Sequence, residues 1–232
     1  VDVKGETPMT AMIYPTTNPA MAEQMVVARG EGPYIFDKQG KQYLEGMAGL
    51  WCTALGYGNE EVIEVAERQM RELSFSHMFG GKTHASAIEL ADKLAAMVPI
   101  QDGRVFLGNS GSDANDTLLK LIRYHAEASG QPNRFKVIAR EQGYHGVTLA
   151  AAALTAIPTN HAHFQLPFEA LGVLRTGSAH YYRGANEGET EADFVARRAE
   201  ELEALILAEG PDTIAAMIAE PVSGAGGVIV PP

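Results

Sequence analysis

The sequence predicts an α/β fold with a largely parallel sheet flanked by helices. From residue 104 onward, short apolar runs alternate with longer segments whose apolar residues recur at helical spacing. One of the runs, Thr213–Ala219, is almost continuously apolar, which is typical of a strand buried in a parallel sheet. A different organisation precedes this region, where the pattern indicates an arm, a hairpin and two helices.

The first part of the chain carries four expected features. Residues 1–33 are rich in Pro, Gly, Thr and Met without a sustained period, so we expect an arm that lies on another surface, such as a second subunit. Two short apolar runs, 34–37 and 41–44, flank the turn sequence Asp-Lys-Gln-Gly and predict an antiparallel hairpin. Asn59 can cap a helix, and a second helix ends at Pro99. The apolar face expected for the first helix is formed by Val62, Ala66, Met70 and Leu73.

The region after Pro99 is expected to alternate between strands and helices. The expected elements are a strand at 104–107, a helix at 112–128, a strand at 135–139, a helix at about 191–208 and a strand at 213–219. The residues expected to align on one face of the helix at 112–128 are Ala114, Leu118, Leu121, Ile122 and His125. The stretch at about 155–190 has no clear period, so we expect a long surface excursion there.

Composition limits the classes of function. The 232 residues are 46 % hydrophobic and 20 % charged, which suits a packed globular core. A formal net charge of −11 disfavours nucleic acid and anionic membranes as partners. The single cysteine, Cys52, cannot form an internal disulfide, and no targeting or membrane-spanning pattern is visible, so a cytoplasmic location is expected.

The most informative segment runs from Phe106 to Ala114, where a strand feeds a turn of Gly, Asn and Ser that opens into an amphipathic helix. The first amides of a helix lack internal partners and lie at the positive end of its dipole, so such a turn can bind an anion. An ordinary helix cap at Ser110 or Ser112 explains the local pattern equally well. Neither a P-loop lysine nor a dinucleotide glycine fingerprint is present, which disfavours ATP and NAD.

Two further segments follow expected strands. Gln142-Gly-Tyr-His-Gly146 presents an aromatic side chain and an imidazole between glycines, and these can stack on and hydrogen-bond a planar heterocycle. Taken alone, an ordinary surface turn is the better explanation. In the third segment Glu220 follows a buried strand and precedes a Gly-rich loop. A carboxylate there needs a partner, a ligand or solvent, and a solvent-facing Glu220 is the alternative.

Three other residue types stand out. The only Trp, Trp51, lies in a Gly-Leu-Trp-Cys segment and can belong to a core or wall a pocket. Cys52 beside it is expected to be a small buried hydrophobe, because no local base would activate its thiol. His161 and His163 have no cysteine or carboxylate at metal-ligand spacing, so we expect them to be solvated and expect no metal site.

In order and separation, these segments resemble the first half of the class III, fold type I aminotransferases that use pyridoxal phosphate. The resemblance covers the whole chain and is to the omega-transaminase, or amine:pyruvate, branch. It implies that Gly111 and Ser112 hold the cofactor phosphate and that Tyr144 stacks on the cofactor ring. The cofactor-binding residues that it implies are Ser110, Gly111, Ser112, Tyr144, His145 and Glu220.

The resemblance also implies a substrate pocket and a division into domains. The implied pocket residues are Trp51, Phe79 and Ala225, with Ser223 at a variable position of the same pocket. Residues 1–58 would form the arm and the small-domain hairpin, and residues 59–232 the first, incomplete part of the large, cofactor-binding domain. The Schiff-base lysine and the aspartate on the ring nitrogen are expected beyond Pro232, so no catalytic residue is assigned. Asp113 stands where the family usually has Glu.

The implied function is transamination from an amine or omega-amino acid to a keto acid such as pyruvate, in a homodimer with interfacial active sites. An acetylornithine-like aminotransferase or an aminomutase shares the same phosphate and ring motifs. From another class, a non-catalytic nucleotide- or cofactor-binding α/β module, or a dimerisation piece, would use the same strand–turn–helix.

Overall fold

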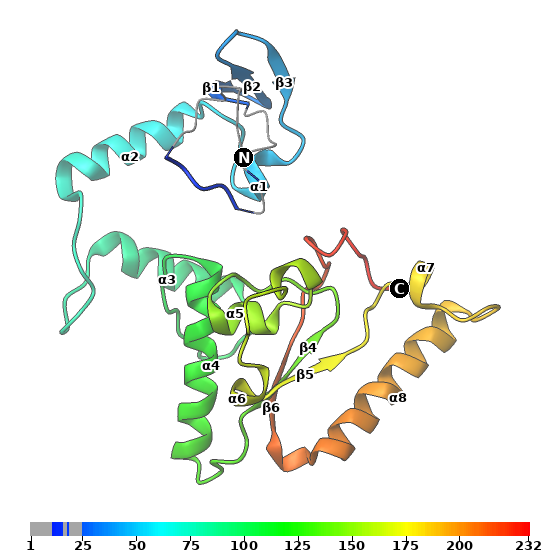
Figure 1. Cartoon of the computed structure of the whole chain (residues 1–232). Helices are drawn as coiled ribbons and strands as arrows, with labels where there is room; N and C mark the ends of the chain where they lie inside the picture. Colours follow the sequence, from blue (N-terminus) through cyan, green and yellow to red (C-terminus); the bar gives the residue numbers. More distant parts are fainter. Residues whose placement is uncertain (1–10, 16–17, 19–24) are drawn as a thin grey trace, which may run out of the picture. The chain divides into compact units, whose positions relative to one another are not determined.

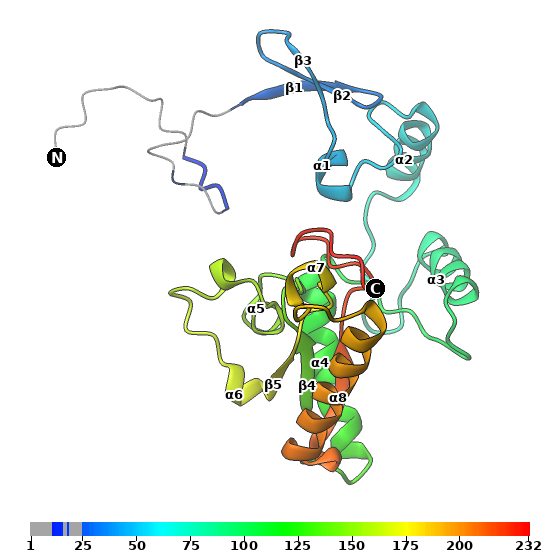
Figure 2. The ribbon, with the colours of Figure 1, turned by 90° about the vertical axis from the view of Figure 1, so that its right-hand side faces the viewer.

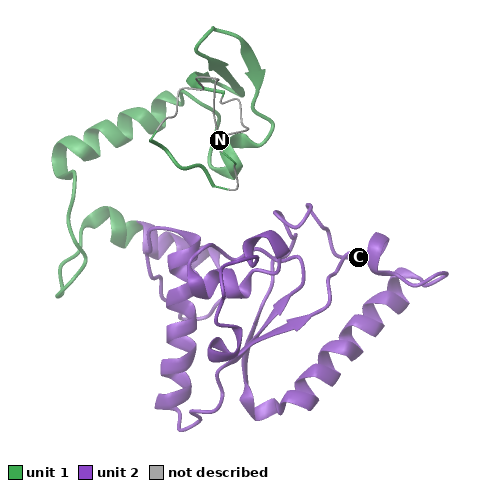
Figure 3. Ribbon diagram, viewed as in Figure 1, with its two compact units in different colours: residues 1–89 green, residues 90–232 purple. Residues whose placement is uncertain are grey.

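The structure, a computed structural model, describes residues 11–15, 18 and 25–232. It contains two compact units, residues 1–89 and residues 90–232, which Figure 3 shows in green and purple. The units divide inside the second expected helix, further along the chain than the predicted boundary at 58/59. That boundary stays a prediction. Each unit is described by itself.

Unit 1 contains a three-stranded antiparallel sheet in the order β1-β2-β3. The strands are β1 (Val27–Glu31), β2 (Tyr34–Asp37) and β3 (Gln42–Leu44). The predicted hairpin is confirmed in β2 and β3, and Asp37 shapes its turn because its Oδ1 accepts hydrogen bonds from the amides of Gln39 and Lys41, both at 2.9 Å.

The arm predicted at 1–33 is partly wrong, because its last residues form β1. Val27 pairs with Asp37 and Glu31 pairs with Tyr34, so these residues gain ladder hydrogen bonds that a structureless arm would lack. The segments 1–10, 16–17 and 19–24, on which the rest of that prediction falls, lie outside the described residues.

A left-handed turn follows the sheet. The four residues of α1 (Ala48–Trp51) have φ angles of 47°, 60°, 55° and 65°, all in the region that L-residues other than glycine rarely adopt. The amide of Cys52 closes the turn onto the carbonyl oxygens of Ala48 and Gly49. Three residues with a side chain therefore share an unfavourable backbone conformation.

Both predicted helices of the first part form, as α2 (Glu60–Leu73) and α3 (Ala85–Met97). The Asn59 side chain caps α2 by accepting from the amide of Val62 at 3.1 Å, as predicted. None of the residues of α2 is buried, and its predicted apolar face leaves 52 % of Val62 and 67 % of Met70 exposed.

Unit 2 carries a three-stranded, entirely parallel sheet in the order β5-β4-β6. Its strands are β4 (Lys136–Arg140), β5 (Val173–Thr176) and β6 (Ile214–Ile218). Its longer helices are α4 (Gly111–Ala128) and α8 (Glu191–Glu209), and its shorter ones are α5 (Leu149–Leu154), α6 (Phe168–Leu171), α7 (Tyr181–Gly184), η1 (Pro158–Asn160) and η2 (Pro211–Thr213). Figures 1 and 2 show α4 and α8 on opposite sides of this sheet. The predicted α/β class with a parallel sheet is confirmed.

The core of unit 2 lies where α4 and α5 meet one face of β4. Leu119 from α4 and Leu154 from α5 pack against Val137 and Ala139. The buried residues of α4 are Leu119 and Ala126, whereas Leu118 and Leu121 are 44 % and 53 % exposed. The predicted face of this helix is therefore wrong apart from Ile122, because apolar residues occur around much of the helix and packing selects only one side.

Two other predictions for unit 2 are wrong. The expected strand at 104–107 does not form: this segment pairs with no described strand, and Phe106 is 67 % exposed. A strand forms only where a neighbour supplies ladder hydrogen bonds, and none of the described strands pairs with this segment. The stretch at 155–190 is not only a surface excursion, because β5 lies within it and pairs in parallel with β4.

Among the described residues, no helix has both the length and the apolar character that crossing a bilayer requires.

Candidate functional site

The N-terminus of α4 is arranged as an anion site. Ser110 has an extended backbone and caps the helix, since its Oγ accepts from the amide of Asp113 at 3.1 Å and its carbonyl accepts from the amide of Ala114 at 3.0 Å. The amides of Gly111 and Ser112 are therefore left without a partner among the described residues. No atom lies within 4 Å of where a Cβ on Gly111 would be, so this end of the helix is open. Its two free amides can receive a phosphate.

The acidic residue of the first turn does not block this opening. The Oδ2 atom of Asp113 accepts from the amide of Asn109 at 3.0 Å, behind the cap. The carboxylate thus closes the turn that precedes the helix.

The loop after β4 packs directly onto this helix end. Ser112 Oγ accepts from the amide of Val147 at 3.0 Å, which leaves the serine hydroxyl hydrogen free to donate. Gly146 has a φ of 135°, and a Cβ there would lie 2.5 Å from Ser112 Oγ and 2.7 Å from the Ala151 side chain. Only glycine allows both this conformation and this approach. The sequence-predicted phosphate turn and the Tyr144–His145 segment therefore belong to one site.

Glu220 joins a third segment to the same loop. Its Oε1 accepts from the amide of Tyr144 at 2.8 Å and its Oε2 accepts from the amide of Gly224 at 2.9 Å. The alternative of a solvent-facing Glu220 is wrong, because both oxygens are occupied by backbone donors. A negative charge held by two amides keeps the loops after β4 and β6 together.

The Gly-rich loop after β6 also lies close to the loop that follows β4. A Cβ on Gly226 would overlap the carbonyl oxygen of Gln142, so glycine is required at this contact. Ala225 is exposed, whereas Ser223 is 4 % exposed and its backbone pairs with Ile229. The assignment of Ala225 to a substrate pocket stays a prediction.

His145 brings an unpaired polar atom to this site. The side chain is 7 % exposed, and its Nε2 has no hydrogen-bond partner among the described residues. Burial lowers the pKa of His145 below its ordinary value, Glu220 opposes this effect and Arg175 adds to it. The imidazole is therefore neutral at neutral pH and can still accept or donate one hydrogen bond.

Tyr144 completes the set of groups that a cofactor can use. It remains 38 % exposed although both neighbours, Gly143 and His145, are buried. Open helix amides, an accessible aromatic ring and an unpaired imidazole nitrogen together fit a ligand with a phosphate and a flat heterocycle. The chemical groups of these residues are therefore suited to binding pyridoxal phosphate. The individual roles stay predictions.

The pocket residues expected in unit 1 are exposed there. Trp51 is 66 % exposed and Phe79 is 82 % exposed. Cys52 is exposed as well, so the prediction of a buried cysteine is wrong; the left-handed turn that precedes it places the segment at the surface of unit 1. The pocket roles of Trp51 and Phe79 stay predictions.

One histidine prediction is also corrected. His161 is half-buried, and its Nε2 lies 2.6 Å from the carbonyl oxygen of Thr155 and 3.2 Å from that of Ala152. It therefore hydrogen-bonds to backbone carbonyl groups at the end of α5 and does not face solvent, whereas His163 is exposed. No group of three or more metal-ligating side chains occurs in the described part of the chain.

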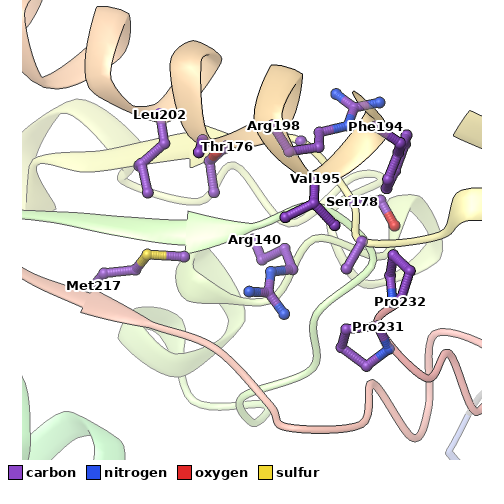
Figure 4. Close-up of a pocket in the computed structure, with 13 residues that line it drawn as sticks. Arg140, Thr176, Ser178, Phe194, Val195, Arg198, Leu202, Met217, Pro231 and Pro232 are labelled. Carbon is purple, nitrogen blue, oxygen red and sulfur yellow. The ribbon is translucent and has the colours of Figure 1, made fainter. Parts of the chain in front are cut away.

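A separate pocket of about 240 Å³ lies between α8 and the sheet (Figure 4). Arg140 and Arg198 line it together with apolar side chains of α8 and the two residues Pro231 and Pro232. Its lining includes none of the residues predicted to bind the cofactor. The predicted site is instead the open surface formed by α4, the loop after β4 and the loop after β6.

Sequence reasoning missed two polar residues that contact this site. Asn115 and Asp116 of α4 both bond to the segment 145–151. They lie three and four positions after Ser112, on the same side of the helix, and this spacing is the signal that could have identified them.

The α/β unit thus combines an open helix end that can receive a phosphate, an exposed aromatic ring and a glycine-rich loop anchored by Glu220, as expected of a protein that binds a phosphorylated aromatic cofactor. Residues 16–232 match the model of the family Aminotransferase class-III, and the chain belongs to this family. Class III aminotransferases use pyridoxal phosphate, which agrees with the groups assembled here.

Known proteins agree with this assignment. A probable gamma-aminobutyrate transaminase 2, mitochondrial, from Oryza sativa subsp. indica is 47 % identical over 211 residues, which are 90 % of this chain and 42 % of the rice protein. A gamma aminobutyrate transaminase 1, mitochondrial, from Solanum lycopersicum is 46 % identical. The omega transaminase from Pseudomonas jessenii in complex with PMP has a TM-score of 0.92 and 49 % identity, over 95 % of this chain and 49 % of that one. The chain thus spans less than half of these relatives, and its fold type I architecture is confirmed.

Proposed function

We propose that the polypeptide containing this chain catalyses pyridoxal-phosphate-dependent transamination, from an amine or omega-amino acid to a keto acid such as pyruvate. The observation that carries this proposal is the convergence of the open amides of Gly111 and Ser112, the exposed ring of Tyr144 and the loop anchored by Glu220. Relatives named gamma-aminobutyrate and omega transaminases support this reaction class.

The residues of this chain would bind and orient the cofactor. Gly111 and Ser112 would donate backbone hydrogen bonds to its phosphate, and the free hydroxyl hydrogens of Ser110 and Ser112 would add two more donors. Tyr144 would cover one face of its ring. When bound, pyridoxal phosphate supplies an electron-withdrawing ring that stabilises negative charge at the substrate carbon.

Glu220 and His145 would shape the protein surroundings of this ring. Glu220 holds the two loops at a fixed separation through the amides of Tyr144 and Gly224. The neutral, unpaired Nε2 of His145 would supply a hydrogen bond to a group that enters the site, because leaving a buried polar atom unpaired is unfavourable.

We further propose that Trp51 and Phe79 wall the substrate pocket. A similar structure, a thermostable omega transaminase variant with 48 % identity, was engineered for asymmetric synthesis of enantiopure bulky amines. It carries replacements of a tryptophan and a phenylalanine whose separation along the chain equals that between Trp51 and Phe79. This agreement favours an amine-accepting pocket over an acetylornithine-like aminotransferase or an aminomutase.

A homodimer and a cytoplasmic location complete the proposal. The homodimer rests on the family resemblance and on the many exposed apolar side chains. The cytoplasmic location rests on the single cysteine, while the rice and tomato relatives are named mitochondrial or chloroplastic. Cell fractionation with organelle markers decides between them, and recovery in an organelle fraction would overturn the cytoplasmic proposal.

The central test uses the encoded polypeptide loaded with pyridoxal phosphate. We expect visible absorbance from the bound cofactor, and alanine formation when an omega-amino acid is supplied together with pyruvate. In Ser112→Ala the cofactor should bind about tenfold more weakly, because one donor to the phosphate is lost. Ser129→Ala, at the other end of α4, is the matched control. Absence of visible absorbance and of amino transfer in the wild type would refute the proposal.

A further inference from the structure

Three polar side chains on one side of α4 hold the loop that follows β4. Ser112, Asn115 and Asp116 are related by three and four positions, so they lie on the same side of the first two helical turns. Ser112 binds the amide of Val147, as described above. The other two residues make contacts that the proposed function does not yet use.

Asn115 binds the backbone of the residue next to Tyr144. Its Nδ2 donates to the carbonyl oxygen of His145 at 2.6 Å. His145 is buried, and its own amide donates to Thr155 Oγ1 at 2.9 Å. Because the carbonyl cannot turn to water, loss of the Asn115 donor would leave a buried acceptor unpaired.

Asp116 fixes the far end of the same loop. Its Oδ1 accepts from the Thr148 hydroxyl at 2.7 Å and from the amide of Ala151 at 3.0 Å. Thr148 is the N-cap residue of α5 but makes no cap bond with its own side chain, so a residue of α4 caps this helix instead. The segment Ala151–Leu154 of α5 is buried, which makes it a rigid base for the loop.

We propose that Asn115 and Asp116 are positioning residues for the cofactor. They fix the distance between the open amides of Gly111 and Ser112 and the ring of Tyr144. A ligand that has its phosphate on the helix and its ring beside Tyr144 must span this distance. This inference rests on the proposed function. The new point is that α4, which would bind the cofactor phosphate, would also determine the position of the cofactor ring through the loop that carries Tyr144.

A purely structural role would give a different result. If the two residues only stabilised the fold, their loss would lower the melting temperature of the cofactor-free protein and leave the intrinsic affinity of the folded site unchanged. A positioning role predicts that cofactor affinity falls more than stability does, because misplacing one part of a binding site weakens every contact that depends on it.

The test compares Asn115→Asp with Asn133→Asp in the encoded polypeptide. Asn115→Asp keeps the shape of the side chain but replaces the Nδ2 donor with an oxygen that faces the His145 carbonyl. Asn133→Asp makes the same chemical change at an exposed position of unit 2. The measurements are the dissociation constant of pyridoxal phosphate from absorbance titration, the melting temperature without cofactor, and hydrogen exchange of the Val147 and Ala151 amides.

We expect Asn115→Asp to weaken pyridoxal phosphate binding about tenfold or more and to speed exchange at Val147. Asn133→Asp should match the wild type in both pyridoxal phosphate affinity and hydrogen exchange at Val147. Asp116→Asn retains an acceptor oxygen and should bind nearly normally, whereas Asp116→Ala should bind weakly and exchange faster at Ala151. If Asn115→Asp does not fold, the two Asp116 variants give the same comparison.

Equal affinities in Asn115→Asp and Asn133→Asp, or in Asp116→Ala and Asp116→Asn, would overturn the inference and leave the proposed function intact. If the wild type binds no pyridoxal phosphate, the proposed function fails, and the positioning role falls with it. Unchanged exchange at Val147 and Ala151 would also overturn the inference, because the loop would then be held by other contacts.

Discussion

The unpaired polar atoms of the site decide which ligand it can accept. Glu220 has both oxygens occupied by the amides of Tyr144 and Gly224, so it holds two loops together. Ser112 has one acceptor position in use and its hydroxyl hydrogen free, and His145 has a buried nitrogen without a described partner. The site therefore offers open amide and hydroxyl donors on α4 and an exposed aromatic ring at Tyr144, which suits a ligand with separate anionic and heterocyclic parts.

Tyr144 gives the first prediction at this scale. Tyr144→Ala should weaken pyridoxal phosphate binding about tenfold, because a stacked aromatic ring contributes about 1 kcal/mol beyond its buried area. Tyr144→Phe keeps the ring and should bind almost as the wild type does. Absorbance titration of the encoded polypeptide measures both, and equal binding by the Ala and Phe variants would show that the ring does not contact the cofactor.

His145 makes stability depend on pH. Its pKa in the folded chain lies below the ordinary 6.5, mainly because of burial, so the unfolded chain binds a proton more readily. As far as His145 is concerned, the free energy of unfolding is therefore highest above pH 6.5. It falls as the pH drops below this value, by at most about 1.4 kcal/mol per pH unit. Urea unfolding of the cofactor-free wild type and His145→Gln, at about pH 7.5 and about pH 5.5, measures this dependence.

The His145 comparison isolates one group among seven histidines, since the other six are present in both proteins. We expect the wild type to lose more stability than the variant between the two pH values. An equal loss would mean that His145 is protonated as easily in the folded chain as in the unfolded one.

Among the elements, α4 and the loop after β4 are joined through Gly146. Gly146→Ala would place a methyl group 2.5 Å from Ser112 Oγ on a backbone with a φ of 135°. We expect it to lower the free energy of unfolding by about 3 kcal/mol, from backbone strain and overpacking together. Gly188 has a φ of 76° with no atom within 4 Å, so Gly188→Ala should cost only the strain, about 1 kcal/mol.

Chemical denaturation of the two glycine variants separates these contributions. Equal losses of stability would mean that the approach between Gly146 and Ser112 is relieved by movement of the loop. In that case cofactor affinity should fall in Gly146→Ala, because the same loop carries Tyr144.

Most elements could be predicted from local patterns. Asn59 gives a capping signal, and β6 gives a nearly continuous apolar run, so both were found. β5 was missed because its four residues include Arg175 and Thr176 and show no alternation. The segment 104–107 has the composition of a strand, but pairing decides whether a strand forms, and pairing is not visible in a local pattern.

The site could be predicted only in part for the same reason. Its three segments each have a local signature of small and aromatic residues, whereas the contacts that join them span long separations. Asn115 reaches a carbonyl 30 residues later, and Glu220 reaches an amide 76 residues earlier. Such pairs depend on how the strands order themselves in the sheet, which a single sequence does not reveal.

For the whole molecule, the exposed apolar side chains argue for assembly. Phe75, Phe79 and Leu55 in unit 1 are 78 %, 82 % and 74 % exposed, and Tyr124 in unit 2 is 74 % exposed. Large exposed apolar areas are unfavourable in an isolated chain and typical of surfaces that another chain or segment covers. The net charge of −11 on this chain disfavours unspecific association between copies, and the proposed homodimer is the assembly that we expect.

The mass of the cofactor-loaded, encoded polypeptide tests this expectation. Sedimentation equilibrium over a wide range of concentrations should give twice the mass of one polypeptide throughout. A single-chain mass at every concentration would contradict the homodimer, while a larger stable assembly would show that the dimer is a building block within it.

The left-handed turn of α1 has a consequence for protein engineering. Ala48, Leu50 and Trp51 each hold a conformation that costs an L-residue about 1–2 kcal/mol, and Trp51 is also proposed to wall the substrate pocket. A glycine at any of the three positions would relieve this cost, so selection for heat resistance alone would enrich glycine there. At Trp51 the same selection would remove the side chain that we propose for the pocket wall, so there a gain in stability would be accompanied by a change in the preferred amine if the proposed role holds.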